Sequence, residues 1–192
     1  MKESRVPRLP AAEAAAAAGD AGVPEFMAEL SVFRVLLRHP RVARAVHDLL
    51  MSMLVDGALD PRLRELVIMR IGWLTASNYE WTQHWRIALG LGISADDLVA
   101  VRDWYTHDAF DSRDRAVLAA TDEMVHDGAI SAKTWAACER ELGPEPAVLI
   151  ELVSAIGAWR MIASLLISLE VPLEDGVASW PPDGQSPSQT IR

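Results

Sequence analysis

Residues 61–85 read PRLRELVIMRIGWLTASNYEWTQHW and give the clearest indication of how the chain folds. The apolar residues of this stretch recur every three or four positions, which is typical of helices rather than strands. Asp60 and Pro61 suit the N-cap and first residue of a helix, and the TASN sequence at 75–78 suits a break between two helices. We therefore predict a helical hairpin, with one helix from 61 to about 74 and the next from 77 to 90 or 92.

Helical spacing continues on both sides of this hairpin. It recurs over 26–37, 42–55, 96–104, 111–125, 131–142 and from 146 onward, while no alternating Val/Ile/Thr run is bounded by Asn-Gly or Asp-Gly. DSRDR at 111–115 echoes DPRLR at 60–64, which is compatible with two related hairpins. We predict an all-α domain over 24–172, with a flexible N-terminal arm over 1–23 and a flexible C-terminal tail over 173–192.

Composition limits the class of protein and its partners. A net charge of −9 argues against nucleic acid or an anionic membrane as the main partner. Residues 147–171 are apolar enough to suggest a membrane span, but they contain Glu151 and Arg160, so we predict a buried helix. Cys138 is the one cysteine, which excludes an intrachain disulfide or a two-cysteine redox or zinc motif. We expect a cytoplasmic protein.

Ser77, Glu80 and His84 are three and four residues apart, so they share one face of the second helix. Glu65 joins this polar row if the chain turns back at 75–78. Burying ionisable groups is costly unless they are paired or used, which makes the row a candidate acid–base site. Ser77 and Glu80 also fit an S-x-x-E capping box, so the pattern alone leaves a capping role open.

The same residues suggest a metal site only weakly. Carboxylates and imidazole bind divalent metals, but the E-x-x-x-H spacing of Glu80 and His84 is common by chance on helices. No second histidine repeats it nearby. We expect no metal and no cofactor.

ELVIMRIGWLTASNYEWTQHWRIALGLGIS at 65–94 and GAWRMIASLLISLEV at 157–171 resemble the carboxymuconolactone decarboxylase family, also called AhpD-like. On the family's spacing, Glu65 takes the position of its glutamate and His84 that of its histidine. Ser77 and Glu80 stand where peroxidase members carry the two cysteines of C-x-x-C. The resemblance implies an AhpD-like bundle of helical hairpins and a homo-oligomer, as a dimer, trimer or hexamer.

The missing cysteines decide which chemistry the resemblance implies. Without a thiolate and a resolving thiol, we do not expect a cysteine-dependent alkylhydroperoxidase. The family's decarboxylase branch is similar in lacking the thiol pair and in needing no cofactor; it removes CO2 from a carboxylated unsaturated lactone and protonates the dienolate. The resemblance therefore implies a lyase in which His84 shuttles a proton and Glu80 or Glu65 orients it.

Further residues are candidates for binding a small-molecule substrate. Arg70 or Arg86 would hold its carboxylate, and Tyr79 would donate a hydrogen bond to an enolate oxygen. Ser77 and Trp81 would line the site, Trp81 as part of an aromatic wall. Isomerisation, cyclisation or retro-aldol cleavage on the same scaffold is an alternative, as is a non-catalytic binding or assembly protein. The surroundings of His84 distinguish them.

Overall fold

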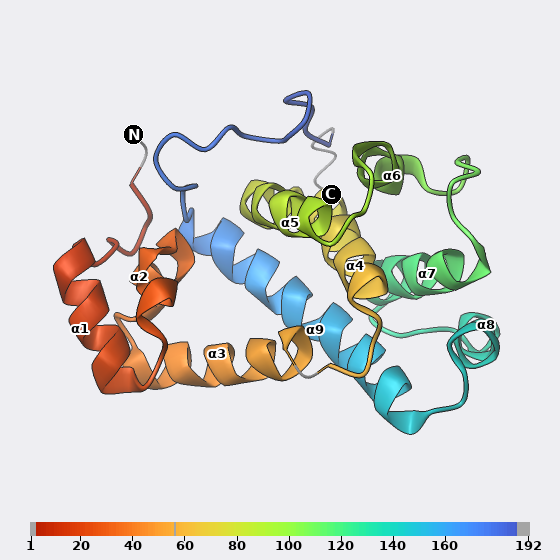
Figure 1. The fold of residues 1–192 in the computed structure, drawn as a ribbon, viewed down its shortest axis with the longest axis horizontal. Helices are drawn as coiled ribbons and strands as arrows, with labels where there is room; N and C mark the ends of the chain where they lie inside the picture. Colours follow the sequence, from red (N-terminus) through yellow and green to blue (C-terminus); the bar gives the residue numbers. More distant parts are fainter. Residues whose placement is uncertain (1–2, 56, 188–192) are drawn as a thin grey trace. The chain divides into compact units, whose positions relative to one another are not determined.

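A computed structural model describes residues 3–55 and 57–187 of the chain. Within these ranges the chain forms nine α-helices and two 3-10 helices and no strand, so the predicted all-α class is confirmed (Figure 1). The backbone contacts divide the chain into two compact units. Unit 1 comprises Met1–Asp56 and Leu165–Val177, and unit 2 comprises Gly57–Ser164 and Ala178–Arg192. Every site discussed below lies within unit 2.

The predicted hairpin is the centre of unit 2. It consists of α4 (Pro61–Leu74) and α5 (Asn78–Gly90). Asp60 caps α4 by accepting hydrogen bonds from the amides of its first turn. The chain reverses through Ala76, whose φ of +55° lies in the left-handed region. A Cβ at Gly72 would lie 3.0 Å from the backbone nitrogen of Trp81, so glycine there lets the two helices approach closely.

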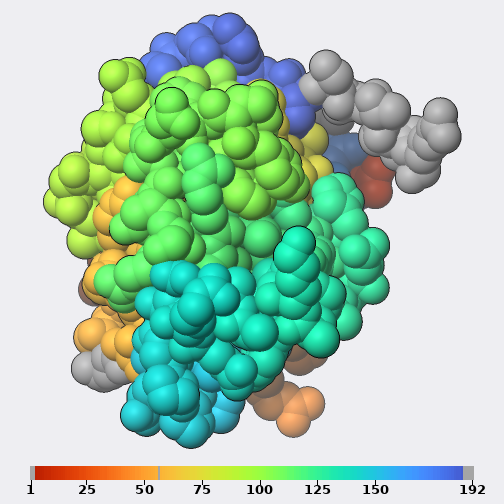
Figure 2. Space-filling model, turned by 90° about the vertical axis from the view of Figure 1, so that its right-hand side faces the viewer, coloured from red at the N-terminus to blue at the C-terminus, as the bar shows by residue number. Residues whose placement is uncertain are grey.

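Among its described residues, unit 2 contains five further helical elements. They are α6 (Ala95–Ala100), η2 (Val101–Asp103), α7 (Ser112–His126), α8 (Ala132–Leu142) and the part of α9 (Pro146–Leu169) that precedes residue 165. α4 packs against α5, α7 and η2, and α7 packs against α8. Figure 2 shows the face on which the green and cyan segments, from α6 to α8, are exposed. α4 is therefore enclosed, and its residues from Leu63 to Gly72 are buried.

α9 has the composition of a core helix and of a membrane span alike. Among the described residues it is the one helix that is long and apolar enough to cross a membrane, judged by length and composition. Core helices of soluble proteins meet the same criterion. Leu152, Ile156 and Trp159 on α9 are fully or almost fully buried.

Unit 1 is built from α1 (Ala11–Ala21), η1 (Glu25–Glu29), α2 (Ser31–Leu36), α3 (Pro40–Leu54) and the segment 165–177. The predicted arm over 1–23 therefore contains a helix. Alanine has the highest helix propensity, and Ala14 and Ala18 are small enough to be buried where α1 packs on α3 and η1. The helix predicted over 26–37 is divided instead, because Leu30 is extended and the Ser31 amide donates to Glu174 at 2.8 Å.

The segment 178–187 lies on α5 within unit 2, although its composition predicts a flexible tail over 173–192. The backbone amide of Trp180 donates to Asn78 Oδ1 at 3.2 Å, and Trp81 Nε1 donates to the carbonyl of Pro181 at 2.7 Å. Arg102 binds the carboxylate of Asp183 through both terminal nitrogens. Segment 178–187 thus makes specific polar contacts with α5 and η2.

Candidate active site

The α4–α5 hairpin brings Glu65 and His84 together in the interior of unit 2. His84 Nδ1 lies 2.7 Å from Glu65 Oε2, the distance of a strong hydrogen bond. The other oxygen of Glu65 lies 3.4 Å from Nε of the buried Arg64. Glu65 is completely buried, and 8% of His84 is exposed. The expectation that Glu65 would join the polar row of α5 is therefore met in the geometry.

Glu80 lies on the other side of the His84 ring. Its Oε2 is 3.5 Å from His84 Nε2, one helical turn along α5. Burial raises the pKa of the Glu80 carboxyl to about 7, with the charge of Glu65 acting in the same direction and that of His84 opposing it. Glu80 is therefore close to half-protonated at neutral pH, which suits a group that gives and takes protons.

Trp159 on α9 completes the surroundings of His84. Its Nε1 donates to His84 Nε2 at 3.2 Å, and the two rings meet edge to face with centroids 6.0 Å apart. This hydrogen bond needs a lone pair on Nε2, so it favours neutral imidazole with its proton on Nδ1, directed at Glu65. Trp159 was not among the residues predicted for the site. The only signal was its place in the quoted segment 157–171.

Two protonation states of His84 compete in this arrangement. Burial alone would lower the pKa of His84, but the charge and hydrogen bond of Glu65 and the charge of Glu80 outweigh it and raise the pKa. The indole N–H of Trp159 favours the neutral ring, whereas the two carboxylates favour the imidazolium. The proton on Nε2 is therefore exchangeable with Glu80, which faces the same nitrogen.

Ser77 occupies the N-cap position of α5 but does not cap it. Its side chain makes no capping hydrogen bond, and its amide donates to the Gly72 carbonyl at 2.9 Å. The capping box that the sequence left open does not form, because the Gly72 carbonyl already accepts from the amide that Glu80 would bind, and Glu80 lies against His84 instead. Ser77 Oγ is buried and has no hydrogen-bond partner among the described residues.

The sequence model of the carboxymuconolactone decarboxylase family matches residues 40–123, which contain Glu65, Ser77, Glu80 and His84. Over residues 40–123 the chain is therefore similar to this family. No curated protein matches the chain in sequence.

Solved structures extend the likeness over most of the chain. A peroxidase-related AhpD-core protein from Ralstonia eutropha is 17% identical and has a TM-score of 0.73, with 91% of this chain and 94% of that one covered. A peroxidase-related protein from a Silicibacter species is 12% identical, with a TM-score of 0.69 and coverage of 84% and 83%. The debrominase Bmp8 is 15% identical, with a TM-score of 0.71 and coverage of 88% and 92%. At these identities the matches establish the fold, which is AhpD-like.

The chain's one cysteine lies outside this site. Cys138 lies on α8, is buried, and directs its Sγ at the carbonyl of Ala116. Burial, reinforced by the charge of Glu123, raises the pKa of its thiol to about 11. A thiol with so high a pKa is almost entirely un-ionised at neutral pH and is a poor nucleophile.

The other predicted substrate-binding residues are distributed over different parts of unit 2. Arg70 is engaged by Asp122, with contacts at 2.6 and 2.9 Å, and Arg86 is exposed and donates to Gln83. Within the described residues, neither arginine bonds to Glu65, Glu80 or His84. Tyr79 and Trp81 are both buried on α5.

No group of three or more histidine, cysteine, aspartate or glutamate side chains in residues 3–55 and 57–187 is placed to hold a metal ion. Both ring nitrogens of the buried His84 face carboxylates, Glu65 at Nδ1 and Glu80 at Nε2. Both ring nitrogens also have hydrogen-bond partners, Glu65 at Nδ1 and Trp159 at Nε2.

Proposed function

We propose that the Glu65–His84–Glu80 row catalyses proton transfer in a cofactor-independent decarboxylation of a small carboxylated lactone or a related carbonyl compound. The observation that carries the proposal is a buried carboxyl with a pKa of about 7, placed 3.5 Å from a histidine nitrogen whose ring is held by a second carboxylate. Groups that titrate near the working pH are the most effective general acids and bases.

Each member of the row has a distinct task in this reaction. The bond between the substrate and its carboxylate breaks, CO2 leaves, and the electron pair remains in a dienolate. His84 as the imidazolium gives its Nε2 proton to the dienolate carbon. Glu80 then returns a proton to Nε2 and is reprotonated by solvent, while Glu65 keeps Nδ1 protonated and the ring in position.

Acid–base chemistry is supported over thiol chemistry by the residues at the family's cysteine positions. Ser77 and Glu80 stand there, and the chain's one cysteine is a buried residue of α8. The structural neighbours are described as peroxidase-related proteins and as a debrominase. Those descriptions belong to those proteins; the row in this chain offers two carboxyls and an imidazole instead of a thiol pair.

The unpaired hydroxyl of Ser77 supports a substrate with an oxygen acceptor. It is buried at the start of α5, three residues from Glu80 on the same face. A buried hydroxyl without a partner is costly, and a carbonyl or enolate oxygen would relieve that cost. In this proposal the protein is a cytoplasmic homo-oligomer whose partner is the small-molecule substrate.

The proposal is tested by measuring CO2 release from a panel of carboxylated unsaturated lactones and β-keto acids. For the substrate that turns over, we expect His84→Gln to lower kcat by roughly 10²–10⁴-fold and Glu80→Gln by a similar factor. His126→Gln replaces an exposed histidine at the end of α7 and is the matched control, with unchanged kcat.

Product analysis on the same panel distinguishes the other reactions. Isomerised, cyclised or cleaved products without CO2 would replace the decarboxylase proposal by another acid–base reaction at this row. Turnover by His84→Gln at the wild-type rate would contradict a catalytic role for the row altogether.

A further inference from the structure

A second polar feature of unit 2 lies where segment 178–187 meets α4, α5 and η2. Three tryptophans gather there: the ring centroids of Trp73 and Trp81 are 5.4 Å apart, and each lies 6.1 Å from that of Trp180. The guanidinium carbon of Arg102 lies 4.8 Å from the Trp73 ring and 5.0 Å from the Trp81 ring. Arg102 is thus held by stacking and cation–π contacts, which orient its fork of donors.

Arg102 uses this fork to bind a carboxylate. Its two terminal nitrogens contact the two oxygens of Asp183 at 2.7 and 2.9 Å, the bidentate geometry that planar carboxylates favour. These hydrogen bonds lower the pKa of Asp183 to about 2, so the carboxylate is ionised at any physiological pH. Arg102 Nε is buried and has no partner among the described residues, so the guanidinium has a donor to spare.

Asp183, which occupies this fork, lies at the surface, and the segment that carries it is strained. About 34% of the Asp183 side chain is exposed, against 10% for Arg102. Trp180 has a φ of +53°, a left-handed conformation that is strained for a bulky residue. Release of the segment would relieve this strain, and the segment's own side chains over 178–187 are already half-buried or exposed. The side chains on η2 and α5 that receive the segment are therefore held more firmly than the segment itself.

We propose that Arg102, Trp73 and Trp81 form a binding site for a planar aromatic carboxylate, and that Trp180 and Asp183 occupy it as an internal ligand. The carboxylate of such a molecule would take the place of Asp183 on Arg102, and its ring would take the place of Trp180 against Trp73 and Trp81. Trp81 Nε1, which donates to the Pro181 carbonyl when the segment is in place, would become available to an oxygen of the ligand.

The chemistry of the present occupant specifies this class of ligand. An aromatic ring and a carboxylate three residues apart are received by tryptophan faces and by a guanidinium. Aromatic rings gain from tilted or edge-on contact with other rings, and a bidentate carboxylate gains both energy and orientation from arginine. An uncharged aromatic molecule could not make the bidentate contact with Arg102, and an aliphatic acid could not make the ring contacts with the tryptophans. The inference concerns binding alone and does not depend on the reaction proposed for His84.

The test uses benzoate as the probe and isothermal titration calorimetry as the measurement, with benzamide and acetate as the uncharged and non-aromatic comparisons. The two partners of the ion pair should have opposite effects. Asp183→Asn weakens the internal competitor and should tighten benzoate binding by roughly two- to fivefold, the range expected for one partly exposed ion pair. Arg102→Gln removes the receptor and should weaken binding at least about tenfold. Asp175→Asn changes an exposed aspartate of the preceding segment and should leave the affinity unchanged.

A second readout keeps the test decisive if Arg102→Gln fails to fold. The indole N–H resonance of Trp81 in the wild-type protein should move, on addition of benzoate, in the same direction as in Asp183→Asn, because both changes weaken the hold on segment 178–187 and with it the hydrogen bond to the Pro181 carbonyl. Arg102→Lys keeps the charge but loses the fork and should bind benzoate more weakly than wild type. Equal binding of benzoate and benzamide, or weaker binding of benzoate by Asp183→Asn, would overturn the proposal.

Discussion

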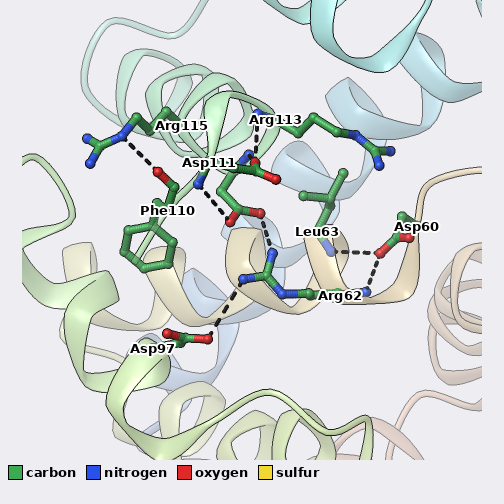
Figure 3. A network of polar contacts seen from close by, with 9 residues as sticks. Asp60, Arg62, Leu63, Asp97, Phe110, Asp111, Arg113 and Arg115 are labelled. Carbon is green, nitrogen blue, oxygen red and sulfur yellow. Dashed lines mark hydrogen bonds and ion pairs between the residues drawn. The ribbon is translucent and has the colours of Figure 1, made fainter. Parts of the chain in front are cut away.

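Unit 2 contains two clusters of carboxylates whose surroundings differ. The first is the Glu65–His84–Glu80 row between α4 and α5. The second, here called the α4–α7 cap cluster, comprises Asp60 and Arg62 at the start of α4, Asp111 and Asp114 at the start of α7, and Asp97 of α6 (Figure 3). In the cap cluster Asp60 and Asp111 each accept two backbone amides. In the row, the polar groups bind one another and leave Ser77 Oγ without a partner among the described residues.

The difference separates structural carboxylates from candidate reactive ones. Amides at a helix N-terminus bind an ionised carboxylate and stabilise it in one state. A buried carboxyl that shares a histidine with a second carboxylate has two states of similar energy. The cap cluster borders an open cavity of about 300 Å³, lined in part by Asp60, Arg62 and Asp114, yet its acids are bound to backbone or to arginine. Cavity size therefore says less about reactivity here than the competition for a proton does.

Truncating one carboxylate in each cluster should produce the largest difference in the free energy of unfolding. Glu65→Ala leaves the Nδ1–H of the buried His84 without its acceptor, so we expect a loss of about 3–5 kcal/mol in the free energy of unfolding. Asp60→Ala removes only a helix cap at an exposed position and should cost about 1 kcal/mol. Urea unfolding of both variants measures the difference. Equal losses would mean that Glu65 is no more than another structural acid.

The raised pKa of Glu80 should make the free energy of unfolding depend on pH. This pKa is about 7 in the folded protein against an ordinary value near 4.5, so between these values the folded state holds a proton that the unfolded state has lost. Stability must then fall as pH rises from about 5 to 7 and level off above. Relative to wild type, Glu80→Gln should therefore gain up to about 3 kcal/mol between pH 5 and pH 8.

Glu123 provides the matched control for this pH profile. Burial alone would raise its pKa, but hydrogen bonds from Thr134 and Ser131 at the start of α8 lower it. Its stabilisation is complete above the ordinary glutamate pKa, so the difference between Glu123→Gln and wild type should stay constant from pH 5 to pH 8. A profile for Glu80→Gln as flat as this control would show that Glu80 stays ionised like the capping acids.

Local sequence predicted the hairpin because its signals are local. Asp60 and Pro61 begin α4, and the break at residues 75–78 lets Glu65 reach His84, so three members of the site were found by spacing. Trp159 was missed because its contact with His84 joins residues 75 apart in the chain, and no periodicity encodes that. Arg70 was selected for its charge, yet Asp122, 52 residues away, engages it. Which partner a buried side chain meets is decided by packing that local patterns do not record.

The smallest expected effect concerns Ser77. Its place at the N-cap of α5 predicts that Ser77→Ala lowers stability, whereas its surroundings in the structure predict no loss. A serine that caps a helix costs about 1 kcal/mol when replaced by alanine, and Ser94, whose Oγ accepts the amide of Asp97 at 3.0 Å, should behave so. Ser77 Oγ is buried without a partner, so Ser77→Ala removes an unsatisfied hydroxyl and should be neutral or stabilise the protein by about 1 kcal/mol. Thermal unfolding of Ser77→Ala and Ser94→Ala gives both signs in one experiment. If Ser77→Ala loses as much stability as Ser94→Ala, Ser77 caps α5 after all. If Ser77→Ala is more stable than wild type and also has a raised KM, the hydroxyl binds the substrate and destabilises the fold.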